Sequence, residues 1–204
     1  MTQSPTASFF IGSFPHHWHA EVLAARPLIL PARHFVYPGQ VEEVERGALE
    51  VLVRPDVIDS SASSQEFLAT CALGFRDPAV PTGLWSCPNP DELCAISGGY
   101  AYIISTHSPE RFTMISYRPV LDVRPAVEQN LLLFVGHYSI LAWGSDGQAW
   151  QSEKLSSEGL TLEEVGGPVL HGMGWDLMTD KEISFALDLK TGRSISPAAP
   201  SFSR

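Results

Sequence analysis

Short runs of β-favouring residues recur along most of the chain, and each run ends close to Gly, Pro, Ser or Asn. Helix signals are scarce, and turn formers follow each run too soon for a typical helix. The pattern predicts an antiparallel all-β protein of roughly a dozen short strands. The predicted strands are ALEVLVR (48–54), EFLATCALGF (66–75), LCAIS (93–97), YAYIIST (100–106), RFTMISY (111–117), VLDVR (120–124), NLLLFVG (130–136), SILAWG (139–144), QAWQSEKL (148–155), LTLEEV (160–165), VLHGMGW (169–175) and EISFALDL (182–189).

Explicit turn sequences separate several of these runs. Asp146 and Gly147 lie between two β-rich runs, and Asp-Gly in that position is one of the strongest short hairpin signals. The pairs 98–99 and 166–167 are both Gly-Gly and mark two further hairpin candidates. Because hairpins join antiparallel neighbours, these turns predict β-meanders rather than parallel crossovers.

Residues 91–112 and 129–150 share one pattern when they are offset by 38 positions, so that Gly98 aligns with Gly136. Each copy reads strand, glycine turn, strand, polar turn and aromatic-led strand, which is a β-meander. A residue able to adopt positive φ would serve each glycine turn. Few aligned positions are identical, so the match indicates a shared strand pattern and leaves duplication of an ancestral unit open.

Three architectures accommodate strands of this kind. Propeller blades show a similar pattern with a period near 40 residues, but a closed propeller needs at least about four blades, and a dozen strands make three at most. The remaining alternatives are a sandwich, a barrel, or a partial propeller that closes only by oligomerising. We expect the sandwich or the barrel.

Three segments are expected along the chain. Residues 1–45 should form an irregular N-terminal arm that packs on the core, with one short helix over Ala20–Ala25 that ends before Pro27. Residues 46–195 should form the all-β domain, and residues 196–204 a flexible tail. An extended arm also favours a homodimer, because such a segment often packs on a second copy.

The composition argues against two kinds of partner. The net charge is −10, and the 13 Lys and Arg residues form no basic run, which argues against nucleic acid and anionic membrane surfaces. No stretch approaches the roughly 18 apolar residues of a membrane-spanning helix, and the N-terminus lacks the basic start of a secretory signal. The three cysteines lack framework spacing and predict free thiols in the cytosol, although a bridge between Cys87 and Cys94 is sterically conceivable.

The segment FPHHWHAE holds three histidines and a glutamate that could supply ligands to a transition metal. His17 and His19 are the better pair, since alternate residues of an extended strand share a face. Adjacent histidines point in different directions, however, and no further ligand is evident nearby. We therefore expect exposed or packed histidines, with a metal site as the alternative.

Other candidate binding residues are aromatic or acidic. Trp85 and Asp91 lie in or beside a Pro-rich and Asn-rich loop, and a recognition surface there is the alternative to a purely structural loop. Tyr100 and Tyr102 share one face of a predicted strand. We expect both in the core, whereas exposed tyrosines would suggest a carbohydrate-binding or protein-binding patch.

His137, His171 and Asp176 complete the candidate ligand-binding residues, and a His/Asp pair from neighbouring strands could act as a general acid–base couple. The chain has no nucleophile elbow, P-loop, dinucleotide fingerprint, HExxH or Ca²⁺ loop. We therefore expect a non-catalytic module that binds a protein or a small ligand. The alternative is a metal-dependent or His/Asp-based hydrolase, which needs two or more of His137, Asp146, His171 and Asp176, or the N-terminal histidines, to converge in one pocket.

Overall fold

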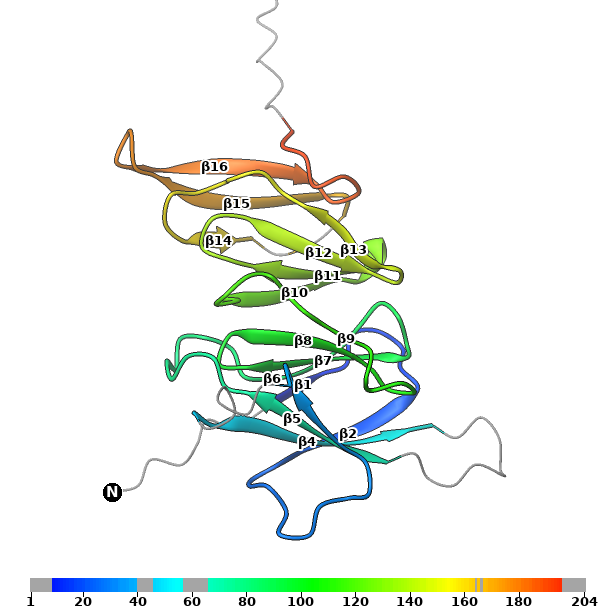
Figure 1. Cartoon of the computed structure of the whole chain (residues 1–204). Helices are drawn as coiled ribbons and strands as arrows, with labels where there is room; N and C mark the ends of the chain where they lie inside the picture. Colours follow the sequence, from blue (N-terminus) through cyan, green and yellow to red (C-terminus); the bar gives the residue numbers. More distant parts are fainter. Residues whose placement is uncertain (1–8, 40–45, 57–65, 164, 166, 196–204) are drawn as a thin grey trace, which may run out of the picture. The chain divides into compact units, whose positions relative to one another are not determined.

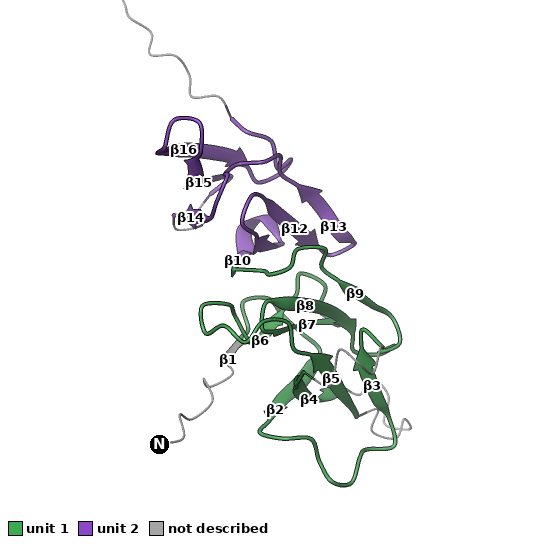
Figure 2. Ribbon diagram, turned by 60° about the vertical axis from the view of Figure 1, so that its left-hand side comes forward, with its two compact units in different colours: residues 1–123 green, residues 124–204 purple. Residues whose placement is uncertain are grey.

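The computed structural model describes residues 9–39, 46–56, 66–163, 165 and 167–195, and the expected tail at 196–204 lies outside them. The described residues form sixteen strands and one three-residue 3₁₀ helix, Val127–Gln129 (Figure 1). The antiparallel all-β prediction is therefore confirmed. The chain divides into two compact units, residues 1–123 and 124–204 (Figure 2), rather than the single β domain expected over residues 46–195.

Unit 1 contains two sheets. The first has the order β2-β4-β5-β3, in which β3 pairs parallel with β5 and the other pairs are antiparallel. The second has the order β1-β6-β7-β8-β9, in which β6 to β9 form a meander and β1 adds in parallel at its edge. The strands of unit 1 are β1 (Phe9–Ile11), β2 (Trp18–Leu23), β3 (His34–Tyr37), β4 (Ala48–Pro55), β5 (Phe67–Ala72), β6 (Gly83–Ser86), β7 (Glu92–Ser97), β8 (Tyr100–Ser105) and β9 (Phe112–Met114).

Unit 2 also contains two sheets, and in both the strand order follows the chain: β10-β11-β12-β13 and β14-β15-β16. The division between the units falls within β10. The strands are β10 (Asp122–Ala126), β11 (Leu131–Val135), β12 (Ile140–Gly144), β13 (Gly147–Gln151), β14 (Leu160–Leu162), β15 (Val169–Asp176) and β16 (Lys181–Asp188). Hairpins join β7 to β8, β12 to β13 and β14 to β15, as the three glycine-containing turns predict.

Each unit has a core shared by its two sheets. In unit 1, Val51 and Phe67 of the first sheet pack in one apolar cluster with Leu93 and Ile104 of the second. In unit 2, the corresponding cluster joins residues of β10 to β13, such as Leu133, with residues of β15 and β16. Two sheets around a common core form a sandwich-like unit, and the described residues form no closed barrel.

The helix expected over Ala20–Ala25 is wrong, because this region lies in and just after β2. The burial of β2 alternates, with Trp18 in the core and His19 exposed, and the strand pairs with β4 along its length. Ala, Glu and Leu favour helices locally, but cross-strand pairing and a buried tryptophan override that weak preference. The expected irregular arm thus contains three strands that belong to the sheets of unit 1.

The 38-residue match corresponds to equivalent meanders, with β7-β8-β9 in unit 1 and β11-β12-β13 in unit 2. The turn residues differ in conformation. Gly98 has a φ of 55°, whereas Gly136 is not among the described glycines with positive φ. The common pattern therefore reflects strand positions, and the two turns are built differently.

The turn glycine at position 98 should tolerate no side chain. A Cβ there would overlap the carbonyl oxygen of Phe75, and the positive φ adds strain. We expect Gly98→Ala to reduce the free energy of unfolding by about 2–4 kcal/mol, from the combined cost of the clash and of φ. The matched control is Gly39→Ala, which has a φ of 96° but only ordinary contacts and should cost about 1–2 kcal/mol. If urea unfolding showed the same loss of unfolding free energy for both variants, the close approach of Gly98 to the Phe75 carbonyl oxygen would be contradicted.

The three cysteines are free and buried, so no Cys87–Cys94 bridge forms. Burial raises the pKa of the Cys71 thiol, and it raises those of Cys87 and Cys94 well above their ordinary value. Because the thiolate is the reactive form, native protein should react with Ellman's reagent only very slowly. All three thiols should react promptly in guanidinium chloride, and rapid labelling of the native chain would contradict this assignment.

Candidate functional site

The N-terminal histidines pair with different aspartates in unit 1. His17 Nδ1 lies 3.0 Å from Asp91 Oδ1, and His107 Nδ1 lies 3.8 Å from the same oxygen. His19 Nε2 lies 3.7 Å from Asp56 Oδ1. His17 and His19 are both exposed while Trp18 between them is buried, but His17 precedes β2 and the two histidines contact different aspartates. Within the described ranges no group of three His, Cys, Asp or Glu side chains is placed to hold a metal ion.

The aromatic candidates in unit 1 belong mainly to its interior. Trp85 is buried in β6, and Tyr102 is buried in β8 with its hydroxyl donating to the Ala72 carbonyl at 3.0 Å. Tyr100 is half-buried and has the Arg118 guanidinium 5.4 Å from its ring centre. A recognition surface containing Trp85 is therefore excluded by its burial, and the expected core position holds for Tyr102.

The candidates in unit 2 do not converge. His137 is exposed in the turn between β11 and β12, and Asp146 is exposed in the turn between β12 and β13. His171 and Asp176 lie at opposite ends of β15 and, because they are five residues apart, on opposite faces of it. These positions do not assemble the acid–base pair that the hydrolase alternative requires.

Asp176 instead organises the hairpin between β15 and β16. Its carboxylate accepts a hydrogen bond from the Thr179 hydroxyl at 2.7 Å and another from the Met178 backbone N–H at 3.3 Å. The hydrogen bonds from the Thr179 hydroxyl and the Met178 backbone N–H lower the pKa of the Asp176 carboxyl below its usual range. This is a local side-chain-to-backbone turn, in which the aspartate serves the structure of the hairpin.

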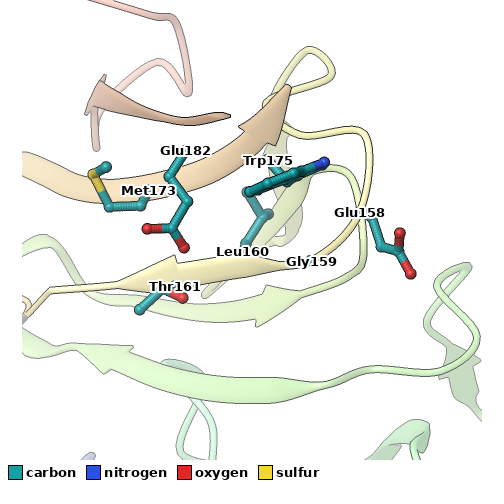
Figure 3. Close-up of a pocket in the computed structure, with 7 residues that line it drawn as sticks. All are labelled: Glu158, Gly159, Leu160, Thr161, Met173, Trp175 and Glu182. Atoms are coloured by element: carbon teal, nitrogen blue, oxygen red, sulfur yellow. The ribbon is translucent and has the colours of Figure 1, made fainter. Parts of the chain in front are cut away.

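A groove of about 450 Å³ lies on the sheet β14-β15-β16, close to two of the predicted residues. Figure 3 shows Met173 and Trp175 on β15, with Glu182 on the neighbouring β16. The segment at the start of β14 completes the wall. The groove is lined by Glu158, Gly159, Leu160, Thr161, Met173, Trp175 and Glu182.

Strand alternation places the large side chains of β15 on the groove face. Gly172 and Gly174 occupy the opposite face, where a Cβ would overlap the Thr161 and Leu155 carbonyl oxygens respectively. The absence of side chains there lets the neighbouring segments approach, so Met173 and Trp175 must project outward. His171 shares this outer face by the same alternation.

The backbone around Trp175 is firmly anchored. The Ser156 hydroxyl accepts a hydrogen bond from the Trp175 N–H at 2.8 Å, and the Ser157 N–H donates to the Trp175 carbonyl at 2.6 Å. On the other side Trp175 pairs in register with Glu182 of β16. The indole is therefore carried by a strand that is held on both edges, and directly opposed residues have Cβ atoms only about 5 Å apart.

The groove combines an aromatic surface with negative charge. Glu158 and Glu182 are its ionisable lining residues, and no Lys or Arg lines it in the described part of unit 2. Glutamate is negatively charged at neutral pH, so the groove presents two carboxylates beside an indole and a thioether. This arrangement favours a cationic or strongly polarised ligand over an anion.

The sequence contained a signal for this groove in the segment HGMGW. Large residues alternate there with glycines, which indicates one crowded face and one face that carries side chains. His171 and Asp176 were the predicted binding residues in this part of the sequence, whereas Met173 and Trp175, which line the groove, were not predicted as binding residues. No local pattern could bring Glu182 and Glu158 to them, because both come from neighbouring segments.

In comparisons with known proteins, the chain matches no protein-family model and no curated protein sequence. The described residues contain no helix long and apolar enough to cross a membrane.

The Asp176 assignment can be tested by titration. We expect the Asp176 carboxyl to titrate below its usual pKa in an NMR titration, and Thr179→Ala to raise that pKa towards the usual value. Because the native pKa is the lower one, the contribution to stability is present above the unfolded-state pKa and is lost as the pH falls through the native one. Thr161→Ala, an exposed threonine on β14, is the control and should leave the pKa unchanged. An unshifted wild-type pKa would contradict the hydrogen bonding.

Proposed function

We propose that this protein is a non-catalytic binding module that recognises a cationic side chain of a partner protein in the β14-β15-β16 groove. The observation that carries the proposal is the placement of Trp175 opposite Glu182, with Glu158 in the same lining. An ammonium or guanidinium group is attracted to the face of an indole and to carboxylates. Both attractions act on the same ligand charge in this groove.

The size of the groove supports a ligand of side-chain dimensions. A volume of about 450 Å³ lies towards the lower end of the range for ligand sites. One lysine or arginine side chain fits this space, with its aliphatic stem against Met173 and Leu160. A long peptide would need contacts beyond the groove.

The expected affinity for one isolated side chain is low. A cation–π contact contributes about 0.5–2 kcal/mol, and each exposed ion pair contributes about 0.2–1 kcal/mol. Such contributions give millimolar binding at best once the loss of ligand freedom is included. The partner must therefore present several contacts at once, which is typical of protein–protein recognition.

A protein partner in the cytosol fits the remaining features. The net charge of −10 favours basic partners and speeds their association. The three free thiols support a reducing compartment. A second copy of the chain remains an alternative partner, whereas the separation of His171 from Asp176 gives the hydrolase alternative no support.

The proposal is tested with the full chain and single-residue probes. We expect Nα-acetyl-lysine methylamide and its arginine analogue to shift the Trp175 indole resonance in ¹H–¹⁵N spectra, with millimolar affinity. The norleucine derivative keeps the four-carbon stem of lysine but lacks the ammonium group, and it should cause no comparable shift of the resonance. Raising the salt concentration should weaken binding, because the groove is exposed.

Variants separate the two attractions. Trp175→Leu should weaken lysine binding about tenfold through loss of the indole face, and its affinity is followed by the backbone amide resonances of β15 and β16 because this variant lacks the indole. Glu182→Gln should weaken it about two- to fivefold. Glu128→Gln removes an exposed carboxylate in Val127–Gln129 and should change nothing. Equal shifts with the norleucine and lysine derivatives, or unchanged lysine affinity in Trp175→Leu, would overturn the proposal.

A further inference from the structure

The strand β16 lies at the edge of the β14-β15-β16 sheet, and among the described residues its first half has a neighbouring strand on one side only (Figure 1). Residues 181–184 in this half are all exposed. The second half is covered, because the segment 193–195 pairs antiparallel with the end of β16. An edge that is covered over part of its length leaves the remaining backbone groups available to another strand.

The hydrogen bonds of the covered half show which backbone groups of β16 point outward. The Ile195 N–H donates to the Ala186 carbonyl at 2.8 Å, and the Asp188 N–H donates to the Arg193 carbonyl at 3.0 Å. The pairing of β15 with β16 has no register shift along its length. Because the direction of backbone groups alternates along a strand, the even-numbered residues of β16 point away from β15.

The N–H and C=O groups of Glu182 and Ser184 therefore point to the open edge. Neither residue makes a backbone hydrogen bond on that side to another described residue. Ile183 and Phe185 point the other way and pair with β15. Glu182 and Ser184 each offer one donor and one acceptor, spaced to receive an extended chain.

The sequence of the chain's own C-terminal segment is unsuited to this position. Ile195 lies opposite Ala186, so a strand that continued in the same register would place Pro197 opposite Ser184. A proline has no N–H to donate to the Ser184 carbonyl, and proline is found in edge strands only where its nitrogen faces away from the neighbouring strand. This argues for a separate segment as the occupant of the edge.

The side chains beside the open edge favour a basic segment. Glu182 lies on the groove face opposite Trp175, and Glu158 lines the same groove. A lysine or arginine that paired with Glu182 from the edge would have its Cβ about 5 Å from the Glu182 Cβ, on the face that carries the indole. Lys181 and Ile183 project from the opposite face by alternation, and Ile183 is 48% exposed, so an apolar residue beside the lysine suits that face. A second copy of the chain would bring the same carboxylates and a net charge of −10, which disfavours it.

We propose that an extended basic segment of a partner protein adds antiparallel to the open edge of β16 as a further strand of the sheet, with a lysine or arginine opposite Glu182 and apolar residues on either side of it. The inference rests on the proposed function, because the groove selects the basic side chain. Backbone hydrogen bonds to Glu182 and Ser184 supply the additional contacts that one isolated side chain lacks. The partner is thereby recognised by its extended backbone as well as by its charge.

The peptide acetyl-Thr-Val-Lys-Val-Thr-amide carries this alternation and is the probe. We expect the full chain to bind it about tenfold more tightly than Nα-acetyl-lysine methylamide, because of the additional backbone hydrogen bonds. Methylation of the lysine backbone nitrogen, which faces β16 in the proposed pairing, should remove this gain. Methylation of the backbone nitrogen of the second valine, which faces away from β16, is the matched control and should leave the gain intact.

Amide hydrogen exchange followed by NMR locates the pairing on the protein. The amides of Glu182 and Ser184 should exchange quickly in the free chain and become protected when the peptide is bound. The amides of Ile183 and Phe185 are the internal control. They should be protected in both states, because they point to β15.

The outcomes distinguish this inference from the proposed function. If the lysine derivative binds but the peptide binds no more tightly, or if both methylated peptides bind as tightly as the parent, the edge pairing is overturned and the groove proposal stands. If a peptide with norleucine in place of lysine binds as tightly and protects the same amides, the basic segment and the proposed function are overturned together. Protection of the Glu182 and Ser184 amides before peptide is added would also overturn the inference, because a second copy or residues 196–204 would then occupy the edge.

Discussion

The alternation of side chains along paired strands is the constraint on which the rest of the structure depends. In each unit, one face of both sheets supplies a shared apolar core, which includes Val51 and Leu93 in unit 1 and Leu133 and Leu187 in unit 2. Burial of these faces fixes the register, because a slip by one residue would turn every apolar side chain outward. The same rule fixes which side chains remain available for binding.

The groove shows this dependence directly. β15 has Gly172 and Gly174 on its inner face where β14 and the preceding segment approach it closely, and the alternate residues Met173 and Trp175 project from the outer face. Unit 1 has a pocket of about 900 Å³ that differs from the groove, because most of its lining side chains are apolar. Two sandwich-like units of similar construction thus present different surfaces.

The strands after residue 46, apart from β6, could be predicted from the sequence, because apolar alternation and turn residues are local signals. Each of the twelve predicted runs overlaps a strand of the structure. The strands in the expected arm, and β6 (Gly83–Ser86) after it, were missed for physical reasons. β2 contains good helix formers, β3 pairs in parallel with a strand distant in sequence, and β6 is a four-residue strand beside Gly and Pro. Their stability comes from pairing and burial, which local propensity does not encode.

The sequence by itself determined the fold class and the meanders, since these follow from local strand pattern and turn residues. Only the tertiary structure decided which side chains meet. It placed Asp91 between His17 and His107, and Glu182 opposite Trp175. These groupings join residues from separate strands and loops, and strand register and sheet packing set them. A binding site depends on such non-local contacts. Single candidate residues could therefore be predicted from the sequence, but the sequence could not predict which of them lie together.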